Sequence, residues 1–378
     1  MVFLALIVIG VAGLWAAAHL WLTGENLSAF DVACGERFDT DREPGAPLQA
    51  IVAMLSDPAS GARALPMRGR IPALRRYIEE MFAHRPYEAT FTPVDCAGVP
   101  GEWVSLPGAD PRRRTLYIHG GAFIIGSPRS HRTLTTRFAA MTGGVVLAID
   151  YRLMPEHPRR AGIDDCRTAY RWMLNHGPQG PQPARTVFVA GESAGGNLTL
   201  SLLAWARDHG VRAPDAAVAM SPATDGTLGS PSLRAHLHSD PMLGPMFGTL
   251  ARIPRWLLLW AAWAQCRIRP NQPVVSPVYG DLSGLPPVLV QVSEVEMLYD
   301  DARRYVNRAR AAGSPVRLQS WNHVVHAWQI FNPELPQALH ALEEVGKFLA
   351  GVTPLASAVP VSTAPVPDQP RAEPVARS

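Results

Sequence analysis

The sequence is poor in the features that mark several large classes of protein. Among its 378 residues there are only four cysteines, and no two of them stand in a Cys-x-x-Cys pair. A disulfide framework is therefore not expected, and the ligand spacing of a zinc site is missing. The formal net charge is only +3, without the concentrated basic face that is typical of nucleic-acid-binding proteins. We expect neither a metal nor a nucleic acid as a ligand.

Charge is also absent from the N-terminal segment MVFLALIVIGVAGLWAAAHLWL, which contains no Asp, Glu, Lys or Arg. About 20 helical residues span the hydrocarbon core of a bilayer. Residues 1–22 are therefore predicted to form an uncleaved membrane anchor, which would make the protein membrane-associated. A signal peptide removed on secretion is the alternative, although its positive n-region is missing. A helix that packs on the following domain is the third interpretation.

The remaining chain has the composition of a large folded domain, and apolar residues make up 47% of the whole. Residues 23–101 mix short helical patterns with Pro and Gly and are predicted to contribute to a cap. Over residues 102–350, apolar strand-like runs alternate with helical stretches, which is typical of an α/β fold with a mostly parallel sheet flanked by helices. Residues 351–378 are rich in Pro, Ala, Val and Ser and are predicted to be a disordered tail.

The predicted strands and helices alternate along this domain. The strands are expected at residues 115–119, 145–150, 186–190, 216–220, 288–292 and 316–321. The helices are expected at residues 71–83, 130–141, 162–175, 194–208, 299–312 and 335–349. An interruption at 222–285 is rich in Pro and Gly and includes the apolar run RWLLLWAAW. We expect this insertion to be a helical cap over a pocket, with a buried helix as the alternative.

A serine between glycines follows the predicted strand at 186–190. Residues 191–196 read GESAGG, and the sequence after them favours a helix. A Gly-x-Ser-x-Gly sequence between a strand and a helix is typical of a nucleophile elbow. This turn would expose the Ser193 hydroxyl beside the N-terminus of the helix, where negative charge is favoured. Ser193 is the predicted nucleophile, and the N–H group of Ala194 is a predicted donor to an oxyanion.

A glycine-rich loop, HGGAF at 119–123, follows the first predicted strand of the domain. Glycines allow backbone N–H groups to approach a ligand closely. The predicted oxyanion hole therefore includes Gly120, Gly121 and Ala122 beside Ala194. Gly121 and Ala122 are the expected donors, and Gly120 is expected to shape the turn.

The base that accepts the serine proton is expected after the last strand. The final stretch, SWNHVVHAWQIF, contains His323 and His326. His323 stands at the predicted strand end, whereas His326 lies in the loop that follows. His326 is the favoured base, and His323 is then a structural residue.

Four carboxylates follow the predicted strand at 288–292, in the sequence QVSEVEMLYDD. Asp300 and Asp301 stand at the start of a predicted helix and suit capping and dipole roles. Glu296 lies in the loop between strand and helix and is favoured over Glu294 as the acid. An acid at this place would orient His326 and stabilise its charged form.

Together these motifs resemble the hormone-sensitive-lipase family of α/β-hydrolases, in its bacterial esterase branch. The resemblance covers residues 102–350 and is carried by HGGAF (119–123), DYRLMPEHP (150–158), GESAGG (191–196), SP and DPML (221–222 and 240–243), the segment 276–302 and HAW (326–328). It implies an α/β-hydrolase fold with a cap. It also places the acid at Glu296, where family members often carry Asp-Pro-Leu.

The reaction implied by the resemblance is the hydrolysis of small-molecule carboxylic esters with short to medium acyl chains. An acyl-enzyme would form on Ser193, with His326 as the base and Glu296 as the acid, and without a metal or cofactor. A lactone or an N-acetyl substrate suits the same residues. A catalytically inactive receptor on the same scaffold is the other alternative, and the presence of His326 favours an enzyme.

Overall fold

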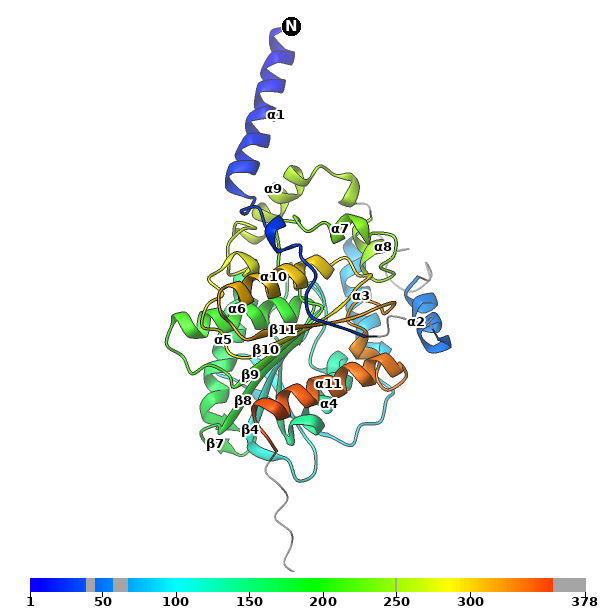
Figure 1. Cartoon of the computed structure of the whole chain (residues 1–378), viewed down its shortest axis with the longest axis vertical. Helices are drawn as coiled ribbons and strands as arrows, with labels where there is room; N and C mark the ends of the chain where they lie inside the picture. The colour runs from blue at the N-terminus through cyan, green and yellow to red at the C-terminus, as the bar shows by residue number, and fades with distance from the viewer. Residues whose placement is uncertain (39–44, 57–66, 249, 356–378) are drawn as a thin grey trace, which may run out of the picture.

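The computed structural model describes residues 1–38, 45–56, 67–248 and 250–355 (Figure 1). In this part of the chain, one sheet contains nine strands in the order β1-β11-β10-β9-β8-β4-β5-β3-β2. Its strands are β1 (Glu36–Phe38), β2 (Thr90–Asp95), β3 (Pro100–Ser105), β4 (Asp110–Ile118), β5 (Gly144–Ile149), β8 (Thr186–Glu192), β9 (Ala216–Met220), β10 (Val288–Ser293) and β11 (Val316–Trp321). Along the sheet, all neighbouring strands from β1 at one edge through to β5 pair in parallel. At the other edge, β3 pairs antiparallel with β5, and β2 pairs antiparallel with β3.

Helices lie on both faces of the sheet (Figure 1). The helices that pack on it are α4 (Arg132–Thr142), α5 (Arg159–Asn175), α6 (Ala194–Asp208), α10 (Tyr299–Ala311) and α11 (Pro336–Val352). The other α-helices described are α1 (Val2–Trp21), α2 (Ala46–Ser56), α3 (Met67–Met81), α7 (Ser232–Ala235), α8 (Leu243–Phe247) and α9 (Arg255–Cys266). After α5, two short strands of two residues each, β6 (His176–Gly177) and β7 (Gly180–Pro181), form a small antiparallel hairpin.

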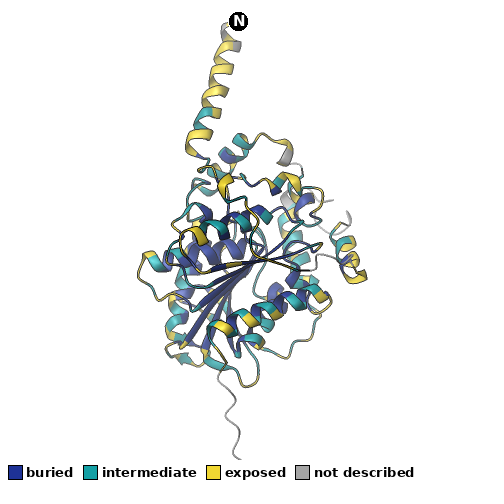
Figure 2. Cartoon of the chain, viewed as in Figure 1, coloured by how far each residue is buried: buried dark blue, intermediate teal, exposed yellow. Residues whose placement is uncertain are grey.

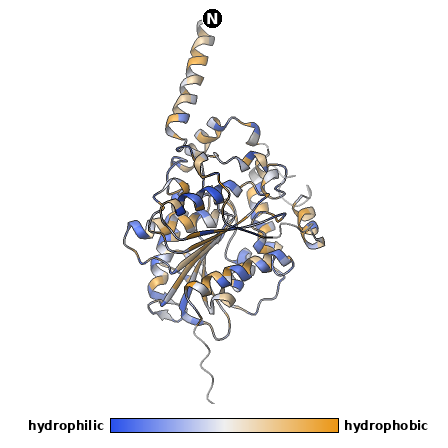
Figure 3. Cartoon of the chain, in the orientation of Figure 1, coloured by the Kyte–Doolittle hydropathy of each residue, from blue (hydrophilic) through white to orange (hydrophobic). Residues whose placement is uncertain are grey.

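Each strand divides its side chains between two cores, because successive residues of a strand point to opposite faces. In β4, Leu116 and Ile118 belong to the core under α5, α6 and α10, whereas Tyr117 belongs to the core under α4 and α11. The strands are buried in Figure 2 and largely hydrophobic in Figure 3. This two-sided burial explains why their sequences are continuous apolar runs rather than alternating ones.

The predicted α/β fold, a mostly parallel sheet flanked by helices, is confirmed. The strands expected at 216–220 and 316–321 coincide with β9 and β11, and the helix expected at 194–208 coincides with α6. The prediction is wrong where it finds only helical patterns before residue 101, because β1, β2 and the first residue of β3 lie there. β2 is an edge strand with exposed residues and Pro93, so its sequence lacks the apolar run of the central strands.

The N-terminal helix α1 projects from the domain and meets it only near its C-terminal end (Figure 1). There Ala18 and Leu22 are buried against Leu259 of α9, and Trp260 Nε1 donates to the Leu14 carbonyl at 3.1 Å. The rest of α1 is largely exposed, so only its C-terminal end packs on the domain as the third interpretation expects for the whole segment. In the portion of the chain that the structure describes, no helix has the length and apolar character needed to cross a membrane, so the predicted spanning anchor at 1–22 is not supported.

The interruption at 222–285 contains the short helices α7 and α8, the longer α9, and a 3₁₀ turn, η5 (Pro277–Tyr279). The apolar run expected to be a cap or a buried helix forms α9, which buries Leu259 and partly buries Trp256, Trp260 and Trp263. These side chains pack beside α1. Residues 356–378, which hold most of the predicted tail, lie outside the described residues.

Replacing Leu147 of β5, which is fully buried, by Ala is expected to lower the free energy of unfolding by about 2–5 kcal/mol, because a cavity replaces the lost side chain. Leu257→Ala is the matched control, since Leu257 is 42% exposed on α9. It should change stability by no more than about 0.5 kcal/mol. Urea denaturation of both variants measures the difference, and equal losses would contradict the placement of the core.

Candidate active site

Ser193 lies between the last residue of β8 and the first residue of α6, in a backbone conformation that residues other than glycine rarely adopt (φ 54°, ψ −117°). A Cβ on Gly195 would lie 1.9 Å from the carbonyl oxygen of Ile118, and one on Gly191 would lie 2.5 Å from the same atom. Only glycine permits these approaches, because the obstacle is backbone. The two glycines thus allow the tight turn that places Ser193 at the carboxyl edge of the sheet.

His326 lies in the loop between β11 and η6 (Trp328–Phe331), and its Nε2 is 2.9 Å from Ser193 Oγ. Burial alone would lower the pKa of the imidazole, but the neighbouring carboxylates, Glu296 foremost, outweigh burial and raise it above its ordinary value. His323, the alternative base, is exposed and does not contact the serine. Of the two histidines, the structure brings His326 to Ser193.

Glu296 is completely buried on the other side of this imidazole. Its Oε1 is 3.4 Å from His326 Nδ1, an ion-pair distance rather than a close hydrogen bond, and its Oε2 accepts a hydrogen bond from Ser221 Oγ at 2.8 Å. Glu294, the alternative acid, instead forms an ion pair with Arg37. The structure therefore brings Glu296, and not Glu294, to the histidine.

Asp300 and Asp301 lie in the first turn of α10, as the predicted dipole role requires. The predicted capping role is wrong, because both carboxylates accept hydrogen bonds from another segment, and the Asp300 N–H in the first turn donates to Ser232 Oγ at 3.0 Å. Asp301 Oδ2 accepts from the N–H groups of Thr224 and Asp225 at 2.8 and 2.9 Å, and Asp300 Oδ2 accepts from Ser232 N–H at 2.8 Å. Asp301 thus ties α10 to the loop after β9, and Asp300 ties it to the first residue of α7.

The oxyanion loop, defined here as residues 119–123, follows the end of β4. Gly121, Ala122 and Phe123 all have positive φ, at 104°, 55° and 64°. In the described part of the chain, the Gly121 and Ala122 N–H groups donate no backbone hydrogen bond. Gly120, which is expected to shape the turn and not to donate to the oxyanion, directs its N–H to Glu192 Oε1 at 2.7 Å.

Glu192 connects this loop to the turn that carries Ser193. Its Oε1 lies 2.7 Å from His131 Nε2, and both side chains are buried. Burial alone would lower the pKa of His131, but the Glu192 carboxylate outweighs it and raises the pKa above the ordinary value. His119 behaves differently, since burial and the nearby His131 lower its pKa to about 3, and its neutral ring contacts the Gly120 carbonyl at 2.8 Å.

Three side chains near the site are missed by the sequence-based reasoning. Ser221 joins Glu296 to the histidine loop, since its Oγ also accepts from Ala327 N–H at 3.1 Å. Asp240 Oδ2 accepts from the backbone N–H of Met297 at 3.0 Å. His131 is the third. Ser221 and Asp240 begin the SP and DPML motifs, which could have identified them, whereas no local signal marks His131.

A cavity of about 390 Å³ opens onto Ser193 and His326. Its apolar wall comes from α2, α3, the 242–246 segment and η6, and consists of Leu55, Leu74, Tyr77, Ile78, Met81, Met242, Leu243, Met246, Ile330 and Phe331. The predicted cap thus contributes through residues 242–246, while none of the described residues of α9 lines this cavity. The site offers an apolar chain a place next to the serine.

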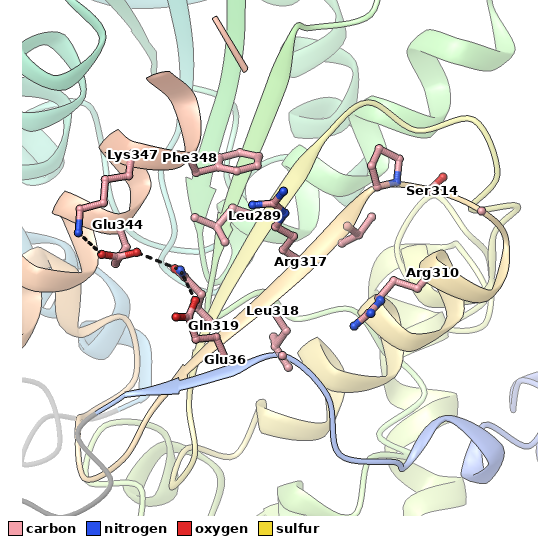
Figure 4. A pocket seen from close by; sticks show the side chains of 14 residues that line it. Glu36, Leu289, Arg310, Ser314, Arg317, Leu318, Gln319, Glu344, Lys347 and Phe348 are labelled. Carbon is pink, nitrogen blue, oxygen red and sulfur yellow. Dashed lines mark hydrogen bonds and ion pairs between the residues drawn. The ribbon is translucent and has the colours of Figure 1, made fainter. Parts of the chain in front are cut away.

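A second hollow, of about 620 Å³, lies along the amino-terminal halves of β10 and β11 (Figure 4). Its polar side chains are largely paired with one another, as in the contacts of Glu344 with Lys347 and Gln319. It is remote from Ser193, which follows the carboxyl end of its strand. Among the described residues, no group of three or more His, Cys, Asp or Glu side chains could hold a metal ion.

Comparison with known proteins identifies the fold and the family of the chain. A family model described as the alpha/beta hydrolase fold matches residues 115–330. The chain is 38% identical over 252 residues to an acetyl-hydrolase of Streptomyces hygroscopicus, covering 67% of this chain and 80% of that protein. It is 34% identical over 278 residues to an esterase of Acinetobacter venetianus, covering 73% and 88%.

Solved structures show the same relationship. The crystal structure of an esterase from the bacterial hormone-sensitive lipase family superposes with a TM-score of 0.70 and 35% identity, covering 82% of this chain and 99% of that one. The fold, the arrangement of the site and these similarities agree. The chain therefore belongs to the hormone-sensitive-lipase-like bacterial esterases of the α/β-hydrolase fold, and it is a carboxylic ester hydrolase.

Proposed function

We propose that this hydrolase cleaves esters of short to medium acyl chains through an acyl-enzyme formed on Ser193, with His326 as the general base and Glu296 as the acid. The observation that carries the proposal is the 2.9 Å contact between His326 Nε2 and Ser193 Oγ at the end of an apolar cavity. A nucleophile within hydrogen-bond distance of a base, which is itself held by a carboxylate, is the arrangement that acyl transfer needs.

In the first half of the reaction, Ser193 Oγ attacks the ester carbonyl while His326 Nε2 takes its proton. The carbonyl oxygen becomes an oxyanion that accepts hydrogen bonds from Gly121, Ala122 and Ala194 N–H groups. The imidazolium is stabilised by Glu296 and then protonates the departing alcohol. In the second half, His326 activates a water molecule that attacks the acyl-enzyme, and Ser193 recovers its proton as the acid is released.

The buried contacts around the triad support these roles. Ser221 holds one oxygen of Glu296 and the backbone of the histidine loop, so the acid and the base keep their separation. Glu192 Oε1 and His131 Nε2 lie 2.7 Å apart and form a buried pair beside the oxyanion loop. Glu192 accepts a hydrogen bond from the Gly120 N–H. The next two N–H groups of the loop, those of Gly121 and Ala122, are then the ones that donate to the oxyanion in this proposal.

We further propose that α2, α3 and residues 242–246 together form a cap over the acyl chain. Their apolar side chains line the cavity beside Ser193, and an apolar wall of this kind selects by the length of the chain it encloses. The similarity to an acetyl-hydrolase supports short acyl groups as substrates.

Ser193→Ala should reduce the hydrolysis of p-nitrophenyl esters by roughly 10⁴- to 10⁶-fold, because the nucleophile is lost. Labelling by a fluorophosphonate probe should disappear in the same variant. Ser201→Ala is the matched control, since Ser201 is buried on the same helix and should leave both readouts unchanged. Specific labelling that persists in Ser193→Ala would place the nucleophile elsewhere. A folded wild-type protein that hydrolyses no ester from acetate to dodecanoate would favour the receptor alternative.

The rate should rise with pH as His326 loses its proton, because only the neutral imidazole can act as a base. Since Glu296 raises the pKa of His326, the midpoint of kcat/KM in the wild type should lie above 6.5. Glu296→Gln removes this charge, so burial should move the midpoint to lower pH while activity falls by roughly 10²- to 10⁴-fold. Glu294→Gln is the control and should leave the midpoint in place. An equal shift in both variants would exclude a specific role for Glu296.

Ile78→Trp should fill the cavity beside α3 and restrict the acyl chain. The ratio of kcat/KM for the octanoate over the acetate ester is expected to fall by at least about 10-fold, the usual effect of removing room for a few methylene groups. Ile253→Trp is the control, because Ile253 is exposed and outside the cavity wall. An unchanged ratio in Ile78→Trp would show that the acyl chain binds elsewhere.

A further inference from the structure

Arg159, the first residue of α5, buries its guanidinium group behind the oxyanion loop. Only 4% of the residue is exposed. Its Cζ lies 3.5 Å from the centre of the Phe123 ring, and its Nη2 donates a hydrogen bond to Asn197 Oδ1 at 2.9 Å. The first contact is a close cation–π interaction, and the second joins two buried side chains.

The surroundings of Arg159 do not otherwise favour a cation. The titratable groups that interact with its charge are Tyr151, Cys166 and Cys266, and no carboxylate of the described chain forms an ion pair with it. The positive end of the α5 dipole opposes a cation at the first position of the helix. Burial lowers the pKa of Arg159 to about 10, so the group is still charged at neutral pH. The favourable contacts that remain are those with Phe123 and Asn197.

The contact with Phe123 bears directly on the oxyanion loop. Phe123 and the residue before it, Ala122, both have a left-handed backbone conformation, which is unfavourable for residues with a Cβ and persists only where the surroundings impose it. The Phe123 carbonyl accepts a hydrogen bond from Met154 N–H at 2.9 Å. The guanidinium on the Phe123 ring adds a second restraint on this turn, which presents the Ala122 N–H group.

The contact with Asn197 bears on the other half of the oxyanion hole. Asn197 lies one helical turn after Ser193, and its backbone N–H donates to the Ser193 carbonyl at 3.0 Å. Its side-chain Nδ2 also donates to the carbonyls of Ala223 and Val275, at 2.6 and 2.9 Å. The amide group is thus fixed on three sides, and it can serve as a rigid support for Arg159.

We infer that Arg159 is a positioning residue that clamps the Ala122–Phe123 turn to the first turn of α6 and so fixes the spacing between the Ala122 and Ala194 donors. The inference rests on the proposed function, since it assigns these N–H groups to the oxyanion. Arg159 acts through Phe123 and Asn197 and does not touch the substrate. A guanidinium suits the task because its plane stacks on a ring while its edge donates to an amide.

The test is Arg159→Met, which keeps the length of the side chain and removes the charge and the donor. Arg160→Met is the matched control, because Arg160 is the next residue and is exposed. The assay is p-nitrophenyl acetate hydrolysis, with active sites titrated by a fluorophosphonate so that kcat refers to competent serines. Loss of one oxyanion donor typically costs about 10²- to 10³-fold in kcat, so a displaced donor should cost about 10- to 100-fold. KM should change by less than about 3-fold, and Arg160→Met should match the wild type.

Three further measurements distinguish positioning from general destabilisation. The affinity for a trifluoromethyl ketone, whose adduct carries an oxyanion, should fall in parallel with kcat in Arg159→Met. Arg159→Lys should recover part of the loss, since it restores the charge. Phe123→Leu should reproduce the loss, and the double variant should be no worse than either single variant, because both act through one contact. If Arg159→Met does not fold, Phe123→Leu and Arg159→Lys carry the test.

The inference is overturned if Arg159→Met matches Arg160→Met per active site, or if the Phe123 and Arg159 losses simply multiply in the double variant. A lower fraction of active protein with unchanged kcat would likewise show a purely structural role. The Ser193→Ala variant separates this failure from that of the proposed function. If hydrolysis survives in Ser193→Ala, the triad is wrong. If hydrolysis requires Ser193 but ignores Arg159, only the clamp is wrong.

Discussion

The start of α6 lies directly against the end of β4, and the rest of the site is arranged around this backbone contact. Gly191 and Gly195 both approach the Ile118 carbonyl so closely that no side chain fits between them. The strained conformation of Ser193 follows from this approach and is held by its N–H donating to the Met220 carbonyl at 2.8 Å. Because the oxyanion loop begins one residue after Ile118, the same contact sets the loop beside the serine.

Buried polar groups then hold the surrounding loops in place, and each one joins segments that are distant in sequence. Glu192 connects the serine turn to Gly120, Ser221 connects Glu296 to the histidine loop, and Asp301 connects α10 to the loop after β9. Burying a polar group costs free energy unless the group is hydrogen-bonded. Each link therefore stabilises the site only while all of its hydrogen-bond partners are present. Hydrogen-bonded polar groups therefore surround Ser193, Glu296 and His326, while the cavity beside them is lined mainly by apolar side chains.

The parts of this architecture that local sequence determines could be predicted, and those that depend on distant contacts could not. Continuous apolar runs identify β9 and β11, and the glycine spacing identifies Ser193, because both signals are contained in a few neighbouring residues. His326 and Glu296 could be placed after particular strands, but the choice over His323 and Glu294 rested on position in the loop. The pairing of Gly120 with Glu192, and of Glu192 with His131, joins residues 72 and 61 positions apart. The burial of Arg159 likewise has no local signal.

The strand β1 also joins distant parts of the chain, and this has a consequence for the order of assembly. Its residues pair with β11, and Glu36 lies opposite Gln319, 283 positions later in the sequence. During synthesis, the N-terminal segment leaves the ribosome long before its partner strand exists. At about 5–20 residues per second, it waits roughly 15 to 60 seconds. The edge of the sheet beside the histidine loop therefore cannot form in a nascent chain until β11 has been synthesised.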